Sequence, residues 1–532
     1  MLKCTINGVE LEVKPGTTII QAMSENAQRI AHYCWHPGLS IAGVCRLCMV
    51  EIEGNPRVQI ACNTTVTEGM KINNTSEKVK DAVKWGLDFH LINHPLDCPI
   101  CDQAGECGLQ DQYMEYGKYN PEMAEKKQKK HKVVDLGPTV VLDSERCILC
   151  SRCVRFTDEV SKTNELGIFN RGDHSEIGTH DGKKLDNNYS LNTVDICPVG
   201  ALTSKDFRFK QRVWYLKDSE TLCNGCSTGC NVSVFFNKEG LFRVKPEYNA
   251  DVNGHWMCDE GRNVYKFVNK ENRLLKGLKF GNGSWHSESH AGAAAKDASV
   301  FLKEAKGDEI ALVLTGQNTV EEYEALLQTF TGEFKTKNVF HWWPHEQQAS
   351  EFDGLLLRGD KNPNTAGLKQ SLEKFGISSK WADLEQGLKS GKIKQLVVVG
   401  PENSAVYADL DQKIAMFALA AHLIYVSSIK VPALESCSTL KTATLIPLKS
   451  YIEKQGTFVN YKGLAQTFKK ATTIVSEALT GTELAQLLAG QQVKIDVIPE
   501  KNLFQAVSNT RPDQVTLDHR KKNEFIFNRG RL

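Results

Sequence analysis

The chain has 532 residues with a formal net charge of +1, and 41% of its residues are hydrophobic and 24% charged. This length suits about three or four globular domains, and the balanced charge gives no general case for a nucleic-acid or anionic-membrane partner. The first residues lack the apolar core of a signal peptide, and the longest apolar stretch, Ile414 to Val426, is too short to span a bilayer. We therefore expect a cytoplasmic protein whose cysteines stay reduced.

The N-terminal residues predict a β-hairpin followed by a helix. Polar and apolar residues alternate over residues 5–13, and Asn7-Gly8 interrupts them with a dipeptide that favours a tight turn. Thr17 is a candidate cap for a helix over residues 19–23. A second stretch with helical periodicity, residues 82–94, ends at a histidine.

Fifteen of the 17 cysteines fall into four sets whose spacings are typical of iron–sulfur proteins. The second set is completed by a histidine, and only Cys4 and Cys437 belong to no set. The sets, called first to fourth below, are Cys34, Cys45, Cys48 and Cys62; His94, Cys98, Cys101 and Cys107; Cys147, Cys150, Cys153 and Cys197; and Cys223, Cys226, Cys230 and Cys258. A disulfide framework is opposed by this clustering and by the expected compartment.

The first set is similar to a plant-type ferredoxin site with a widened first gap, which favours a 2Fe–2S cluster on a small β-grasp domain. Gly38 and Gly43 are expected to let the backbone close on the sulfurs and donate N–H groups to them. The second set is one cysteine short unless His94 binds, and the H-x3-C-x2-C-x5-C spacing favours ligation. A neutral imidazole in place of a thiolate makes a cluster easier to reduce.

The third set opens with a bacterial ferredoxin triplet, and Cys197-Pro198 most simply completes it. The fourth set places three cysteines on one turn and the last one after a predicted pair of strands, residues 231–236 and 241–244. Structural zinc is the competing interpretation of any C-x2-C pair, and it stays open for this fourth set.

Residues 125–132 form a basic run, EKKQKKHK, between the second and third sets. We interpret it as a solvated linker or a patch facing a partner subunit. A nucleic-acid site is the alternative, but the run has no interleaved aromatic residues.

After residue 300 the pattern alternates between strand and helix. Strands are predicted at Ile310–Leu314, Leu396–Val399 and Leu423–Val426, with a helix over residues 320–330, which indicates a parallel α/β sheet. The chain has no G-x-G-x-x-G after a strand and no Walker A loop, so no nicotinamide, flavin or ATP site is expected. Electrons would then enter from, and leave to, other polypeptides.

The order and spacing of the four sets resemble those of the large (75 kDa-type) iron–sulfur subunits of respiratory complex I, which in bacterial NADH–quinone oxidoreductases are the G subunits. The resemblance covers residues 1 to about 262. It implies a 2Fe–2S cluster at the first set and a 4Fe–4S cluster at each of the other three, with His94 as a ligand. The fourth cluster would be the extra one that some bacterial members keep off the main electron path.

The C-terminal half is similar to the molybdopterin-oxidoreductase fold through residues 443–447 and 453–460. A working pterin enzyme would need more chain and a metal ligand in the right loop, and Cys437, expected to be a buried apolar residue, is the one cysteine there. We therefore expect a shortened, degenerate domain that holds no molybdopterin.

The predicted fold is multidomain α+β and α/β. It comprises a 2Fe–2S β-grasp domain (1–80), a His/Cys3 4Fe–4S domain (81–120), a 4Fe–4S ferredoxin-like domain (121–215), a 4Fe–4S domain of the molybdopterin-enzyme type (216–272) and the shortened α/β domain (273–532).

The resemblance implies an electron-relay protein that passes electrons from an NADH/FMN subunit towards quinone, coupled in the whole complex to proton translocation. Further implied partners are a small 2Fe–2S subunit and the 4Fe–4S and quinone-arm connecting subunits. Membrane contact would come only through the complex, at the cytoplasmic face of the plasma membrane, and no catalytic residue is needed. The alternatives are the electron-transfer subunit of a soluble NAD-linked hydrogenase or formate dehydrogenase, and a zinc-stabilised binding module without redox function.

Overall fold

A computed structural model describes residues 1–118, 125–180, 182–288 and 290–495. The chain separates into two compact units. Within the described residues, unit 1 comprises residues 1–216 and Glu247–Asp259, and unit 2 comprises Lys217–Pro246 and residues 260–495. The last predicted domain includes residues 496–532, which lie outside the described residues. The division into five domains stays a prediction.

Unit 1 begins with a mixed five-stranded sheet in the order β2-β1-β5-β3-β4. Its strands are β1 (Leu2–Ile6), β2 (Val9–Val13), β3 (Met49–Ile52), β4 (Gln59–Ile60) and β5 (Met70–Asn73). The predicted hairpin of β1 and β2 is confirmed, and both of its turn residues, Asn7 and Gly8, have the positive φ that a tight hairpin turn requires. Strand β1 pairs in parallel with β5, which gives the β-grasp arrangement expected from the first cysteine set.

Helix α1 (Ile19–Glu25) buries Ile19, Ile20 and Met23 in the core of this sheet. The predicted cap is wrong by one residue. Thr18, not Thr17, accepts a hydrogen bond from the Gln21 amide, and the Gln21 side chain accepts one from the Thr18 amide. A capping box needs its partner three residues after the cap, and Thr18 meets that spacing.

Helix α2 (Glu77–Leu91) begins earlier than predicted, where Ser76 accepts a hydrogen bond from the Val79 amide at 3.3 Å. Its buried residues Val79, Val83 and Leu87 recur every four positions, which defines the face that packs on the core. The first turn of α2 is charged, so the periodicity of apolar residues in the sequence does not show where this helix begins. The helix ends before His94, so that this side chain lies on a loop.

The remainder of unit 1 surrounds the second and third cysteine sets. Its helices and strands are α3 (Gly108–Tyr116), β6 (Val134–Asp135), β7 (Val140–Leu142), α4 (Arg152–Arg155), β8 (Leu166–Phe169), β9 (Glu176–Thr179), α5 (Asn192–Asp195) and β10 (Leu202–Ser204). Strands β10, β7 and β6 form an antiparallel sheet, and β8 pairs with β9. One hydrophobic core joins these elements and includes cysteines of three sets, Cys34, Cys45, Cys107, Cys150 and Cys153.

The basic run at residues 125–132 is mostly exposed, as a solvated segment would be, but three of its lysines bond to the rest of unit 1. Lys127 donates to the carbonyls of Leu91 and Ile92, at 2.8 and 3.0 Å, and thereby caps the end of α2. Lys130 donates to the Ser175 carbonyl, and Lys132 forms ion pairs with Asp97 and Glu145. Residues 125–132 are therefore held against the rest of unit 1 by the side chains of their lysines.

Unit 2 contains a three-stranded antiparallel sheet of β11 (Lys217–Leu222), β12 (Asn231–Asn237) and β13 (Gly240–Pro246). Strands β12 and β13 are the predicted pair, and the prediction is confirmed. Cys223, Cys226 and Cys230 lie on the loop between β11 and β12.

The larger sheet of unit 2 has seven strands in the order β15-β14-β20-β19-β18-β16-β17. They are β14 (Leu278–Gly281), β15 (Ser284–Ser287), β16 (Ile310–Thr315), β17 (Val339–Trp342), β18 (Gln395–Val399), β19 (His422–Ser427) and β20 (Ala443–Pro447). The predicted strands correspond to β16, β18 and β19, and the parallel pairing is confirmed. Strands β14, β15 and β17 were not predicted because they are short and carry polar or aromatic residues.

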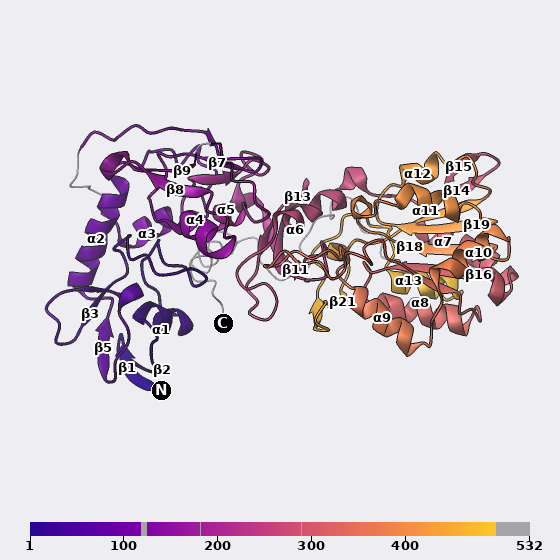
Figure 1. Cartoon of the computed structure of the whole chain (residues 1–532), viewed down its shortest axis with the longest axis horizontal. Coiled ribbons are helices and arrows are strands. Elements are labelled where there is room, and N and C mark those ends of the chain that lie inside the picture. Colours follow the sequence, from indigo (N-terminus) through magenta and orange to yellow (C-terminus); the bar gives the residue numbers. More distant parts are fainter. Residues whose placement is uncertain (119–124, 181, 289, 496–532) are drawn as a thin grey trace. The chain divides into compact units, whose positions relative to one another are not determined.

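The helices of unit 2 cover both faces of this sheet. They are α7 (Ala291–Glu304), α8 (Val320–Gly332), α9 (Thr365–Lys374), α10 (Trp381–Lys389), α11 (Leu410–Phe417), α12 (Pro432–Glu435) and α13 (Gly481–Leu488). Leu312 and Leu314 face the core with α8 and α13, whereas Val313 faces the core with α11 and α12. Figure 1 shows these two pairs of helices on opposite sides of the sheet. Burial on both faces explains why the parallel strands are continuously apolar.

A buried histidine in β19 is expected to make the stability of unit 2 depend on pH. His422 is 2% exposed, and burial lowers its pKa to about 4. The unfolded chain binds a proton near pH 6.5 and the folded chain only near 4, so stability falls as the pH drops through this window, by up to about 3 kcal/mol. We expect His422→Gln to flatten this dependence, measured by hydrogen exchange of β18 and β19 amides between pH 7 and about 4. The exposed His286→Gln variant is the control, and an equal effect of both would contradict the prediction.

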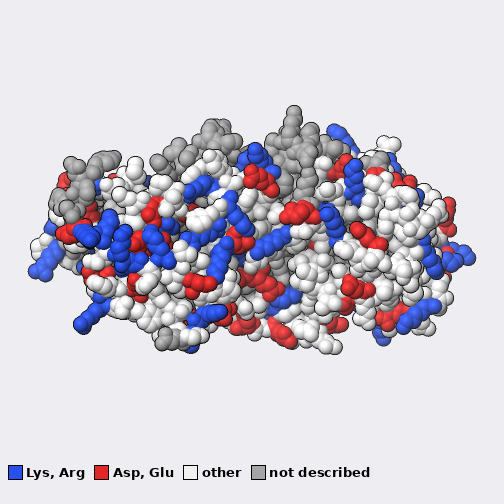
Figure 2. All heavy atoms as spheres, turned by 90° about the horizontal axis from the view of Figure 1, so that it is seen from above, with Lys and Arg blue, Asp and Glu red and all other residues white. Residues whose placement is uncertain are grey.

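Positive and negative side chains are interspersed on the face of the molecule seen in Figure 2. This mixture agrees with the formal net charge of +1. Among the helices of the described residues, none is both long enough and apolar enough to cross a bilayer.

Candidate iron–sulfur sites

The first set is assembled by the loop between α1 and β3 together with Cys62. All four side chains are at most 4% exposed. The thiol of Cys34 is hydrogen-bonded with those of Cys45 and Cys62, and Cys62 also contacts Cys48. These hydrogen bonds hold the pKa of the Cys34 thiol far below its usual range. The structure therefore brings the four predicted residues near one another.

Backbone amides surround the sulfurs of the first set. The Tyr33 amide donates to Cys45 Sγ at 3.4 Å, and the amides of Val44 and Cys45 face Cys34. Gly43 has a φ of +66°, a conformation that glycine adopts without strain, and it permits this turn. The expectation for Gly38 is wrong, because its amide donates to the His36 ring and not to a sulfur. Backbone N–H groups that donate to cysteine sulfurs stabilise a cluster when reduction gives it more negative charge.

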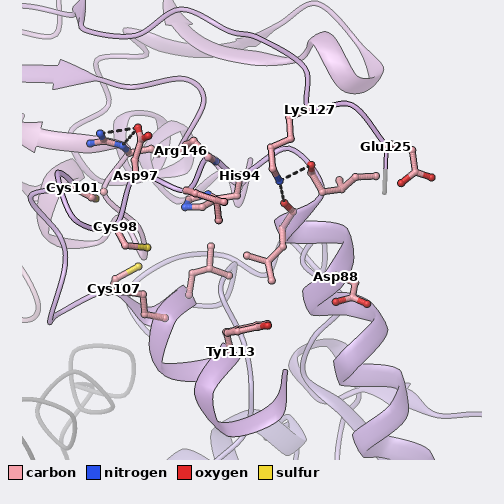
Figure 3. A pocket seen from close by; sticks show the side chains of 17 residues that line it. Asp88, His94, Asp97, Cys98, Cys101, Cys107, Tyr113, Glu125, Lys127 and Arg146 are labelled. Atoms are coloured by element: carbon pink, nitrogen blue, oxygen red, sulfur yellow. Dashed lines mark hydrogen bonds and ion pairs between the residues drawn. The ribbon is translucent and has the colours of Figure 1, made fainter. Parts of the chain in front are cut away.

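The second set lines a cavity of about 510 Å³ between α2, α3 and the loop at residues 94–107. In Figure 3 the sulfurs of Cys98 and Cys107 point toward one another at one side of this cavity, with His94 beside them. Burial lowers the pKa of His94 to about 4, so its imidazole is neutral, as a metal ligand must be. Its Nδ1 atom is buried and has no hydrogen-bond partner. That orphaned nitrogen fits a histidine ligand.

Cys101 is held from three sides. Its amide donates to Asp97 at 2.7 Å, and its carbonyl accepts from Arg212 at 2.6 Å. Gly200 lies directly against its sulfur, since a Cβ on Gly200 would stand 2.2 Å from Cys101 Sγ. The segment that follows Cys197 of the third set therefore forms one wall of the second site.

The third set lines a small apolar cavity of about 20 Å³. Burial raises the pKa of Cys147 to about 12 and that of Cys150 to about 11. Backbone amides of Val199, Ala201 and Leu202 face the sulfur of Cys197. Leu149 and Ser151 both have a positive φ, which non-glycine residues seldom adopt. The tight turn of the loop between the cysteines therefore carries backbone strain. Buried cysteines that face backbone amide donors are suited to bind a metal cluster as thiolates.

The first three sets are linked by protein atoms within unit 1. Tyr33 is fully buried and lies within electrostatic reach of Cys45 and Cys107, which add to the burial that raises its pKa. The Gly108 amide donates to the Pro198 carbonyl at 3.0 Å, which joins the second and third sets. Helix α4 connects the first and third sets through its arginines.

In unit 2, Cys223, Cys226 and Cys230 are each at most 5% exposed. The Cys223 amide donates to the Cys230 carbonyl at 2.8 Å, and the Gly225 amide donates to Cys223 Sγ at 3.4 Å. Burial raises the pKa of Cys223 to about 12. Cys258 is a buried residue of unit 1, and its place in the fourth set stays a prediction.

Several residues that shape these sites were not predicted, among them Tyr33, Arg152, Arg155 and Gly200. A basic residue inside the third triplet and a glycine three positions after Cys197 are the signals that could have drawn attention to two of them. Within the described ranges, no three His, Cys, Asp or Glu side chains converge closely enough to hold a single metal ion. Cys437 is only partly buried, against the expectation of full burial.

Four family descriptions match consecutive parts of the chain, and each contains one cysteine set. They are a 2Fe-2S iron-sulfur cluster binding domain over residues 1–77 and the NADH-ubiquinone oxidoreductase-G iron-sulfur binding region over 86–121. The ferredoxin-like domain of NADH-quinone oxidoreductase subunit 3 matches residues 137–203, and the molybdopterin oxidoreductase Fe4S4 domain matches 216–270.

The curated relatives have matching names. The NADH-quinone oxidoreductase G subunit of Rickettsia felis is 37% identical over 325 residues, 60% of this chain and 47% of the relative. Its counterpart in Rickettsia bellii is 41% identical over 50% of this chain and 39% of the relative. The mitochondrial NADH dehydrogenase [ubiquinone] iron-sulfur protein 1 of Solanum tuberosum is 37% identical over 64% and 46%. The chain thus spans about half the length of these relatives or less.

A crystal structure of an NAD+-reducing [NiFe]-hydrogenase also aligns, with a TM-score of 0.37 and 29% identity over 40% of this chain and 91% of that chain. The mixed sheets, the iron–sulfur family matches and the identity to several G subunits agree with one another. In its four iron–sulfur segments, the chain is similar to the G subunits of NADH-quinone oxidoreductase.

Proposed function

We propose that this chain is an electron-relay subunit of an NADH–quinone oxidoreductase, which passes electrons from an NADH/FMN-binding subunit towards quinone. One observation carries the proposal: three cysteine sets share a single hydrophobic core, and protein contacts join each pair of sets. Sites placed this way suit electron transfer, because the protein's task is then to hold and tune cofactors. No catalytic acid, base or nucleophile is required.

The proposed ligands follow the sets. A 2Fe–2S cluster would be held by the first set, and 4Fe–4S clusters by the second set, with His94, and by the third and fourth sets. When bound, these clusters supply one-electron redox chemistry. The chain's own residues exclude water, hold the thiolates and direct amide donors at the sulfurs. We propose no NAD, FMN or molybdopterin on this chain.

The wider setting is also proposed. The relatives named as subunits of an NADH-quinone oxidoreductase support partners within such a complex. We propose that these partners are a subunit that carries NADH and FMN, a small 2Fe–2S subunit, and subunits that connect to the quinone arm. The chain would act at the cytoplasmic face of the plasma membrane through that complex, and proton translocation would be a property of the whole assembly.

Exchanging the histidine ligand tests the second site. We expect His94→Cys to retain a 4Fe–4S cluster but to lower its reduction potential, because a thiolate adds a negative charge where the imidazole is neutral. The measurement is a redox titration followed by low-temperature electron paramagnetic resonance (EPR). His90→Gln in α2, which lies outside the four sets, is the control. An unchanged potential and spectrum would show that His94 is not a ligand.

The first experiment on the proposal is EPR of anaerobically purified, dithionite-reduced protein, with iron, zinc, nickel and molybdenum counted on the same sample. We expect one 2Fe–2S signal and up to three 4Fe–4S signals with little zinc. Abundant zinc without a paramagnetic signal would replace the proposal by a metal-stabilised binding protein. Bound nickel or molybdenum would favour the hydrogenase or formate dehydrogenase alternative.

A further inference from the structure

Two arginines of the short helix α4 lie between the first and third cysteine sets. Arg152 is 2% exposed. One of its terminal nitrogens donates to the Ile196 carbonyl at 3.1 Å, and the other donates to the Trp35 carbonyl. Ile196 directly precedes Cys197 of the third set, and Trp35 directly follows Cys34 of the first. A single guanidinium therefore holds the backbone next to a cysteine of each set.

Arg155, one helical turn further, makes the same connection a second time. Its guanidinium donates to the carbonyls of Cys34 and Ser40 on the first loop, and to that of Cys150 at 3.5 Å. The same loop is tied down once more by Glu159, which accepts hydrogen bonds from the amide and the hydroxyl of Ser40. The two loops are thus fastened through charged groups and not only through apolar packing.

The charge of Arg152 acts on both sets. A buried guanidinium loses hydration and needs negative charge nearby to compensate. Burial lowers the pKa of Arg152, and the thiols of Cys150, Cys34 and Cys45 act against that shift. Its neighbouring titratable groups include Arg155 and His36, and burial keeps the pKa of His36 well below its usual value.

We propose that Arg152 and Arg155 are positioning residues that fix the separation of the first and third sites and raise the reduction potentials of the clusters held there. The proposal rests on the proposed function in one respect, that these two sets hold iron–sulfur clusters. The transfer that it supports involves one electron, with no bond formed or broken and no proton required. Negative charge added at either site is stabilised by a nearby cation that water screens poorly.

Arginine suits this position for a geometric reason. Its planar fork presents several donors in fixed directions and keeps its charge when buried, whereas lysine is a point charge without the fork. Arg152 uses two of these donors on carbonyls from segments far apart in the sequence. Arg152→Lys therefore retains the charge and loses one contact, and Arg152→Gln loses the charge.

The test uses the full chain with its clusters assembled, and the readout is the midpoint potential of each EPR signal. We expect Arg152→Gln to lower the potentials at the first and third sites by about 59 mV, a tenfold change in the ratio of reduced to oxidised cluster, and to leave the second site unchanged. Arg152→Lys should restore most of the potential. Arg171→Gln, an exposed arginine of the same unit, is the control.

Unchanged potentials at both sites with a full iron content would overturn the proposal, as would an equal shift in the control. If the Arg152→Gln protein does not assemble its clusters, the Arg155→Gln variant is measured instead, because Arg155 is only half-buried. Lower potentials at both sites in this variant would support the proposal, and unchanged potentials would refute it. Absence of both signals from the unaltered protein would refute the relay function itself, before any variant is compared.

Discussion

Gly200→Ala is expected to abolish the cluster at the second site while the first site stays intact. The added Cβ would stand 2.2 Å from Cys101 Sγ, closer than such atoms approach, and 3.0 Å from the Cβ of Gln103, which is a tight contact. The backbone of Cys101 cannot move aside, because hydrogen bonds from Arg212 and to Asp97 hold it in place. Either the sulfur turns out of the site or the loop after Cys197 moves away.

The measurement is the iron content, expected to fall by about four atoms per chain, with loss of one 4Fe–4S signal. The matched control is Gly167→Ala in β8, where the added Cβ would find its nearest neighbour at 3.4 Å, an ordinary contact. Retention of the second-site signal in Gly200→Ala would show that Cys101 has room to move, or that it is not a ligand.

Lys454→Met is expected to destabilise unit 2 by about 3–5 kcal/mol, because it leaves two buried carboxylates facing each other without a cation. Lys454 is 2% exposed and contacts Glu322 at 2.8 Å and also Glu402. Despite burial, these carboxylates raise the pKa of Lys454. Methionine retains most of the apolar stem, so the loss is mainly electrostatic.

Glu322 and Glu402 also organise the backbone around them. Glu322 caps α8 through the Thr319 amide and accepts from the Gly481 amide at the start of α13, while Glu402 accepts from the Tyr451 amide. The network therefore joins α8, α13 and the segment after β18. Removal of its cation is expected to loosen all three together.

Hydrogen exchange of β16 and β18 amides in the full chain reports this loss without requiring that the two units unfold together. Lys374→Met is the control, since its pair with Glu324 is exposed and is expected to contribute less than about 1 kcal/mol. Equal protection in the two variants would mean that the buried triad does not stabilise unit 2.

The same network shows what the motif at residues 453–460 does in this chain. Glu453 pairs with the fully buried Arg273, and Lys454 bridges Glu322 and Glu402. Gly456 lies against Thr319, where a Cβ would stand 2.5 Å from a methyl group. Asn460 closes the turn through the amides of Lys462 and Leu464. These residues stabilise the fold, so the motif has a structural role in this chain.

The sequence by itself determined the chemistry and several local elements. Ligand spacing within a loop is a local property, so the cysteine sets and the role proposed for His94 could be inferred before any contact was known. The β1–β2 turn at Asn7-Gly8 and the apolar runs of β16, β18 and β19 were predictable for the same reason. Even so, the helix starts at Thr18 and Ser76 were missed, because only the hydrogen bonds of the folded helix show which residue is the cap.

Only the tertiary structure decided which sites meet and what holds them. Arg152 and Trp35 are 117 residues apart in the chain, Arg155 and Cys34 are 121 apart, and Lys454 and Glu322 are 132 apart. No spacing rule reaches across such distances, because the contacts depend on how helices and loops pack. Burial increases the energetic effect of these contacts. A buried charge cannot be hydrated by water, and a side chain added at a packed glycine has no free space to enter.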